Sequence, residues 1–176
     1  NEAADRGDIN ALPAAEKADI LRKIGMAALK YHIIRVHPKK RMVFDPKESV
    51  DLQGQTGPYI QYSFVRANGL LKKVALDQWT PGSELPEVLQ PQEKELLILL
   101  YDYPTVVKDA AMNYDPSVIA NYAYALAKSY HKFWHDLPMI KAPTAEKDLR
   151  IKLSSIVKQV LQHSMNLLGI PMPQRM

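Results

Sequence analysis

Two tyrosines and an arginine recur at helical spacing near the middle of the sequence. Tyr59, Tyr62 and Arg66 are separated by three and four residues, so a helix would place their side chains on one face. Phenol rings and a guanidinium group can stack on unpaired bases and contact phosphate. The same periodicity also fits half-buried core tyrosines beside a solvated arginine. The spacing alone therefore leaves a nucleic-acid surface and a packed core face as alternatives.

A histidine pair is the other arrangement with a chemical spacing. His131 and His135 are four residues apart, which is a metal-ligand spacing on a helix. A zinc site needs three or four ligands, and the sequence has no cysteine and no third histidine nearby. We therefore expect no metal and interpret the pair as solvated histidines near phosphate. No glycine-rich phosphate loop and no Gly-x-Ser-x-Gly motif is present, so we expect no catalytic residue in this chain.

Helix-start and helix-stop signals surround these residues. Thr56 or Gly57 can cap a helix that runs from Pro58 to about Val74, because proline is favoured in a first helical turn. Asp115 before a proline predicts a second start. Further signals predict helices over about 13–37, 91–103, 106–112 and 144–168. Pro104 is expected to separate the helix over 91–103 from the short helix over 106–112.

The predicted helix over 116–137 has one continuous apolar stripe. Tyr130 lies in the middle of that stripe, and Trp134 lies at its edge. The apolar stripe of the last helix is predicted to comprise Leu149, Leu153, Ile156, Val160 and Leu167.

A turn signal at Asp45 and Pro46 stands between two short apolar segments, residues 42–44 and 50–52, which predicts a small β-hairpin. The fold class is therefore an all-α helical bundle with one β-hairpin.

Composition limits the class of protein. The 176 residues are 47% hydrophobic and 24% charged, carry a net charge of +4 and contain no cysteine. No apolar run approaches the roughly 20 residues that span a membrane, and the acidic N-terminus is unlike a signal peptide. We expect a globular, cytoplasmic protein without a membrane partner. Mild basicity is compatible with a nucleic-acid partner.

Three segments together resemble the arginyl-tRNA synthetase family. They are Gly57-Pro58-Tyr59-Ile60-Gln61-Tyr62 with Arg66, the stretch 24–31, and the C-terminal stretch 167–176. The resemblance extends from about Ile24 to Met176, and Gln174 stands where the family has glutamate. Leu149-Arg150 resembles the end of the family's Asp-Ala-Leu-Arg signature, whereas Lys147-Asp148 departs from its beginning.

The resemblance implies a division of the chain and a partner. Residues 1–55 would be the end of the catalytic body, with a long helix and the hairpin, and residues 56–176 a helical, DALR-type anticodon-binding domain. The partner would be arginine tRNA, with no DNA contact. The implied contacts to the anticodon loop are Tyr59, Tyr62, Arg66, Tyr130, Trp134 and Met176.

The resemblance also implies that ATP with magnesium serves only the full-length enzyme, in ATP-dependent arginylation of tRNA. The ATP-handling motifs of the family do not occur here, so we expect this chain alone to hold no cofactor and to be inactive. The oligomeric state is left open, with a monomer expected for the full-length enzyme. The alternative is a helical protein-interaction scaffold without RNA. Exposure of Tyr59, Tyr62, Arg66 and Trp134 together beside Met176 would favour RNA, and their burial would favour the scaffold.

Overall fold

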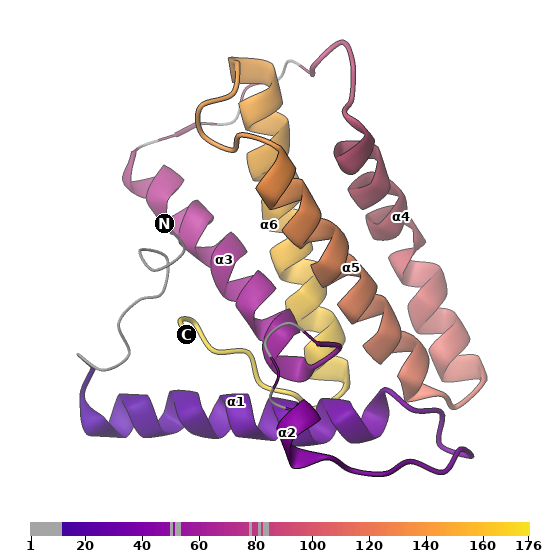
Figure 1. Ribbon diagram of the computed structural model, residues 1–176. Coiled ribbons are helices and arrows are strands. Elements are labelled where there is room, and N and C mark those ends of the chain that lie inside the picture. The colour runs from indigo at the N-terminus through magenta and orange to yellow at the C-terminus, as the bar shows by residue number, and fades with distance from the viewer. Residues whose placement is uncertain (1–11, 50, 52–53, 78, 81, 83–84) are drawn as a thin grey trace.

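Six helices make up the ordered architecture of the computed structural model, which describes residues 12–49, 51, 54–77, 79–80, 82 and 85–176. Helices α3 (Gly57–Leu76), α4 (Pro91–Met112), α5 (Pro116–Asp136) and α6 (Thr144–Leu167) pack side by side. Helix α1 (Ala14–Ile34) lies across one end of this bundle, and the short α2 (Pro46–Ser49) packs on α1. Figure 1 shows α1 running roughly crosswise to the other long helices. The expected all-α bundle is confirmed.

Local capping signals set where the main helices begin. The Thr56 hydroxyl accepts the N–H of Tyr59 at 3.2 Å, and the Asp115 carboxylate accepts the N–H of Ser117 at 3.0 Å. Each bond satisfies a backbone donor that a first turn leaves without a partner. At the far end of the chain, Gly169 has φ +66° and ends α6, as a C-terminal glycine does. The predicted starts of α3 and α5 and the predicted end of α6 are thus confirmed.

Helix α4 contradicts the predicted break at Pro104. The helix is continuous from Pro91 to Met112 with Pro104 inside it. An interior proline removes one helical hydrogen bond and normally kinks or ends a helix. Here the Pro104 side chain is exposed, while Leu96 before it and Ala110 after it are buried in the same core. Packing on both sides of the proline outweighs the local cost, so tertiary contacts decide the helix length.

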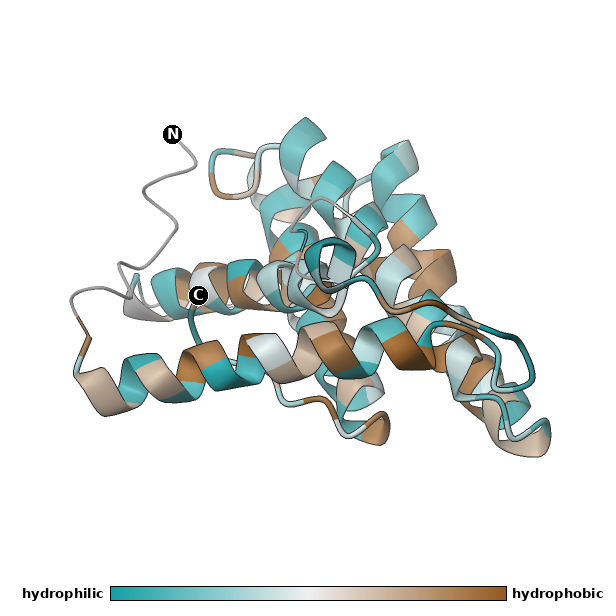
Figure 2. Cartoon of the chain, turned by 60° about the horizontal axis from the view of Figure 1, so that its bottom comes forward, coloured by the Kyte–Doolittle hydropathy of each residue, from teal (hydrophilic) through white to brown (hydrophobic). Residues whose placement is uncertain are grey.

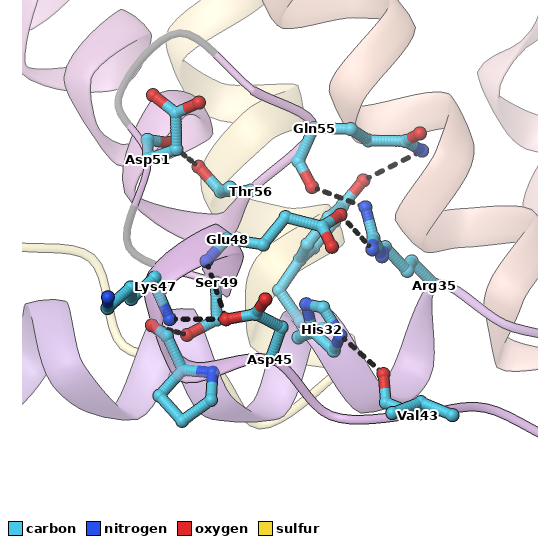
Figure 3. A network of polar contacts seen from close by, with 12 residues as sticks. His32, Arg35, Val43, Asp45, Lys47, Glu48, Ser49, Asp51, Gln55 and Thr56 are labelled. Atoms are coloured by element: carbon cyan, nitrogen blue, oxygen red, sulfur yellow. Dashed lines mark hydrogen bonds and ion pairs between the residues drawn. The ribbon is translucent and has the colours of Figure 1, made fainter.

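The predicted β-hairpin is not formed by the described residues, among which there is no strand. In its place, the Asp45 carboxylate accepts the N–H groups of Lys47 at 2.8 Å and Glu48 at 3.2 Å. This cap starts the single turn of α2, and Figure 3 shows the two bonds. An aspartate before proline serves a helix start as readily as a β-turn, and the sequence signal did not separate the two. Val50 and Leu52 lie outside the described residues.

The core is formed by side chains from α1, α3, α4, α5 and α6. Tyr31, Phe64, Leu126 and Phe133 are fully buried at its centre. On α6 the predicted stripe is wrong in part, since Ile156 and Leu167 are exposed while other apolar residues of the helix are buried. The apolar residues buried on α6 are Leu149, Ile151, Leu153, Val157, Leu161 and Met165. Because α6 contacts α3, α4 and α5, its buried surface is wider than one stripe.

Two contacts hold the start of α3 against α1. Gly57 approaches the backbone of α1 so closely that an added Cβ would lie 2.3 Å from the carbonyl oxygen of Ala27. Arg35, just after α1, donates to the carbonyl oxygen of Gln55 at 3.1 Å and to Glu48 at 2.7 Å. Figure 3 shows the Arg35 side chain joined by dashed lines to both residues. The first turn of α3, which carries Tyr59, is therefore fixed in position by α1.

The outward side of α1 is unusually apolar. Leu21, Leu29 and Ile33 are each between 39% and 50% exposed. In Figure 2, α1 runs across the front of the molecule with apolar residues spread along its length. No helix in the described part of the chain is long and apolar enough to cross a membrane.

Candidate nucleic-acid interface

Arg66 is the centre of a group of aromatic side chains between α3 and α5. Its Nη2 donates to the Tyr62 hydroxyl at 2.7 Å, and its Nη1 lies 3.2 Å from Nδ1 of His131. Because arginine only donates, Nδ1 of His131 is the acceptor and carries no proton in this contact. The guanidinium carbon lies 4.7 Å from the centre of the Tyr62 ring and 5.5 Å from that of Trp134. Both distances lie within the range of cation–π interactions.

Tyr59 extends this group by one helical turn. Its ring centre lies 5.4 Å from that of Tyr124 and 6.1 Å from that of His131, both on α5. The Tyr59 side chain is half-buried, and burial together with the neighbouring Tyr124 raises its pKa. The phenol is therefore neutral at physiological pH and can donate a hydrogen bond. We call Tyr59, Tyr62, Arg66, His131 and Trp134 the aromatic–arginine cluster.

The helix geometry explains why these residues meet. Tyr59, Tyr62 and Arg66 lie on one side of α3, turned toward α5, whereas Ile60 and Phe64 point into the core. The cluster residues from both helices are all partly exposed. The arrangement can therefore contact a ligand while its own packing keeps the rings in place.

A hollow adjoins the cluster at Arg66 and Trp134. It has a volume of about 290 Å³, near the lower end of the range for ligand pockets. Gly69 and Lys73 of α3 contribute to its wall, and apolar side chains of Val65, Leu70 and Ile140 complete it. Nε of Arg66 is buried and has no hydrogen-bond partner among the described residues. The hollow thus combines a flat aromatic wall with cationic groups, which suits a planar, polar ligand.

Tyr130 lies beneath this surface in the core, and its assignment as a contact to the anticodon loop stays a prediction. Its side chain is 0% exposed, and burial raises its pKa. Its ring centre is 6.2 Å from that of Trp134 and 5.9 Å from that of Phe133. Tyr130 is buried because it lies in the middle of the apolar stripe of α5, a position that is visible in the sequence. Tyr130 supports Trp134 from within the core.

Met176 is at the end of a tail held on another side of α3. Gln61 donates to the carbonyl oxygen of Pro171 at 2.8 Å, and Asn68 donates to that of Gln174 at 3.1 Å. Gln61 and Asn68 are each two residues from a member of the cluster, which places them on roughly the opposite side of the helix. In Figure 1 the C-terminus lies on the α1 side of α3. The expected meeting of Met176 with the other candidates is not seen.

Sequence reasoning missed the role of His131 and Tyr124. The sequence predicts His131 and His135 as a solvated pair, whereas the structure brings His131 into contact with Arg66 and Tyr59. Among the described residues, no three side chains of the kinds that bind metals gather in one place. A usable signal was present, because Tyr124, His131 and Trp134 recur at intervals of seven and three along α5, which places them on one side.

The bundle and its cluster define a class of protein: an all-α domain that presents aromatic rings and a guanidinium group on one face, as domains that bind single-stranded nucleic acid do. Residues 60–176 match the model of the DALR anticodon binding domain family. The chain belongs to that family. Membership favours the anticodon-binding interpretation over a scaffold without RNA.

Curated relatives and solved structures agree with this family. The chain is 40% identical over 181 residues to an arginine–tRNA ligase of Phocaeicola vulgatus, and 42% identical over 173 residues to one of Bacteroides thetaiotaomicron. These matches cover 99% and 97% of the chain but 29% of each relative. The arginyl-tRNA synthetase of Thermus thermophilus matches with a TM-score of 0.86 and 29% identity, over 95% of this chain and 29% of that one. The chain thus spans less than a third of these proteins.

Proposed function

We propose that this chain is the anticodon-binding region of an arginine–tRNA ligase and that the aromatic–arginine cluster binds the anticodon loop of arginine tRNA. The observation that carries the proposal is the position of Arg66, bonded to Tyr62 at 2.7 Å and 5.5 Å from the ring of Trp134. Family membership supports the same partner. In the complete enzyme, which acts in the cytoplasm, this contact supports arginylation of tRNA with ATP and magnesium.

The chemistry of the cluster suits an unpaired loop. Bases that leave the helical stack can rest on the rings of Trp134, Tyr62 and Tyr59, and each stacked base contributes about 1–3 kcal/mol. Arg66 is held by Tyr62 and His131, so little side-chain entropy is lost when it meets a base or phosphate. Lys73 at the edge of the hollow adds a second cation.

Residues 1–55 form the end of the catalytic body in this proposal, and residues 56–176 form the anticodon-binding domain. The matched family model, which begins at residue 60, supports a boundary near the start of α3. The exposed Leu21, Leu29 and Ile33 of α1 support a partner surface in the remaining two thirds of the enzyme. The binding of ATP and arginine belongs to that remainder.

The test is binding of the 176-residue chain to an arginine tRNA and to the same tRNA with a substituted anticodon loop, at two salt concentrations. Non-specific basic proteins also bind RNA, and their affinity falls steeply with salt. We expect tighter binding to the cognate loop, with the preference retained at the higher salt. Trp134→Ala should weaken cognate binding about tenfold or more, through loss of stacking.

The matched control is Tyr101→Ala, which removes a largely exposed aromatic ring from α4, away from the cluster. Equal binding of both RNAs, or an equal effect of the two substitutions, would contradict the proposal. Met176→Ala tests the tail separately. A loss of affinity would place Met176 in the interface, as its sequence assignment predicts, and wild-type affinity would remove it.

A further inference from the structure

A second hollow lies between α4 and α5, next to the cluster but distinct from it. Its volume is about 480 Å³. Ile98 and Leu99 of α4 and Ala125 of α5 provide apolar wall, while Lys128 and Lys132 provide two ammonium groups. We call this feature the α4–α5 groove.

The two lysines of the groove are one helical turn apart and extend from the same side of α5. Both are exposed, and neither forms an ion pair with any residue that the structure describes. The acidic Asp136 on the same helix is bonded to His135 at 3.0 Å and to Gln92 at 3.0 Å, and these bonds, with a smaller contribution from the charge of Lys132, lower its pKa. The one carboxylate that lines the groove is Glu95, so two cations face one anion there.

Ser129 adds a hydroxyl group without a partner. It lines the groove, its side chain is 5% exposed, and its Oγ has no hydrogen bond within the described residues. A buried hydroxyl without a partner costs free energy that a hydrogen bond from a ligand would recover. Ammonium groups, a hydroxyl and an apolar wall together match a phosphate joined to a sugar.

The groove and the aromatic–arginine cluster share no residue and lie on neighbouring sides of α5. Lys132 directly follows His131, which contacts Arg66, and Lys128 precedes His131 by three residues. A strand whose bases stack on the cluster therefore needs only to cross α5 to bring its next phosphates to these lysines. The charge and the position beside the cluster on the same helix favour one occupant, a single polynucleotide strand, over an acidic peptide.

We infer that the α4–α5 groove binds the ribose–phosphate backbone of the RNA strand that flanks the nucleotides stacked on the aromatic–arginine cluster. The inference rests on the proposed function and assigns it a second contact. Lysine ammonium groups act on phosphate as point charges and do not distinguish bases. The groove therefore contributes affinity and strand direction, while the cluster contributes selection between anticodons.

The experiment compares two double variants of the 176-residue chain, Lys128→Gln with Lys132→Gln and, as a control, Lys94→Gln with Lys108→Gln. The control removes the same charge from exposed lysines of α4 that do not line the groove. Affinity for the cognate and the anticodon-substituted tRNA is measured over a series of salt concentrations. Thermal unfolding of each variant confirms that it folds.

We expect the groove variant to bind both RNAs about tenfold more weakly and to reduce the salt slope by about 1.4, since each phosphate contact of single-stranded RNA contributes about 0.7. The ratio between the two RNAs should stay as in the wild type. Ser129→Ala should weaken both RNAs to a smaller and equal extent. The control variant should change the slope much less.

Three results would overturn the inference. If the groove and control variants weaken binding equally, the lysines act only through overall charge. If the ratio between the RNAs changes in the groove variant alone, the groove selects bases and is not a backbone site. If the groove variant binds as the wild type does, RNA does not enter the groove. In each of these cases the proposed function stands if the wild type prefers the cognate loop. If the wild type shows no such preference, the proposed function and the inference about the groove are both contradicted.

Discussion

Glu93 and Arg150 form an ion pair that is almost wholly removed from solvent, with 2.7 Å between Oε1 of Glu93 and Nε of Arg150. The pair joins the first turn of α4 to α6. Arg150 also donates to the carbonyl oxygen of Pro138 at 2.8 Å, between α5 and α6. The second oxygen of Glu93 accepts the N–H of Gln90 at 2.7 Å. These contacts therefore join α4, α6 and the segment that follows α5 at one point.

We expect Glu93→Leu and Arg150→Met each to destabilise the fold by about 3–5 kcal/mol, because each leaves a buried charge without its partner. The double variant should cost clearly less than the sum of the two, since it removes both charges. Urea unfolding followed by circular dichroism measures all three. Strict additivity would show that the two residues do not depend on each other.

Gly57→Ala should destabilise the chain by more than 1 kcal/mol, because the new Cβ would lie 2.3 Å from the Ala27 carbonyl oxygen and force α1 away from α3. Gly25→Ala is the matched control within α1. A Cβ at Gly25 meets nothing within 4 Å, so this change should stabilise the helix by about 0.5–1 kcal/mol. Thermal unfolding of both variants gives the comparison, and equal shifts would mean that the close approach has no energetic weight.

Tyr31 predicts a loss of stability at alkaline pH. Burial raises the pKa of its phenol to about 12, and the hydroxyl donates to the carbonyl oxygen of Ala120 at 3.2 Å. Since the folded pKa lies above the unfolded value of about 10, the neutral phenol stabilises the fold fully below pH 10, and this contribution is lost as pH rises toward 12. Its size is on the order of 2–3 kcal/mol.

The check on Tyr31 is the difference in unfolding free energy between the wild type and Tyr31→Phe, measured by denaturant from pH 8 to 11.5. We expect the wild type to be more stable by about 1 kcal/mol at pH 8, from its hydrogen bond, and to lose this advantage above pH 10. Tyr114→Phe is the control, because Tyr114 is 90% exposed. A constant difference for Tyr31 would refute the expectation.

Arg66→Lys separates geometry from charge in the aromatic–arginine cluster. Lysine keeps the positive charge but cannot bond to Tyr62 and His131 together in the planar fork that arginine uses. We expect affinity for the cognate loop to fall about tenfold, with the salt slope unchanged. Arg22→Lys, an exposed change on α1, should have no effect. Unchanged affinity and unchanged preference in the Arg66→Lys variant would mean that Arg66 acts as a charge alone.

Much of the helical framework follows from signals that act over one to four residues. A proline in the first turn and a capping side chain act locally, so the starts of α3 at Thr56 and of α5 at Asp115 could be read from the sequence. The same holds for the end of α6 at Gly169, which needs a positive φ. Helical periodicity likewise placed Tyr59, Tyr62 and Arg66 on one side of α3.

Only the tertiary structure decided which of these signals prevail and which faces are covered. Pro104 stays inside a helix because α4 is packed on both sides of it, and Tyr130 lies in the core because α5 turns it inward. The tail of Met176 lies away from the cluster because Gln61 and Asn68 bind its backbone on another side of α3. Which side chains are buried depends on which helices pack against each other. That packing is determined by residues far apart in the sequence, so a local sequence pattern cannot predict it.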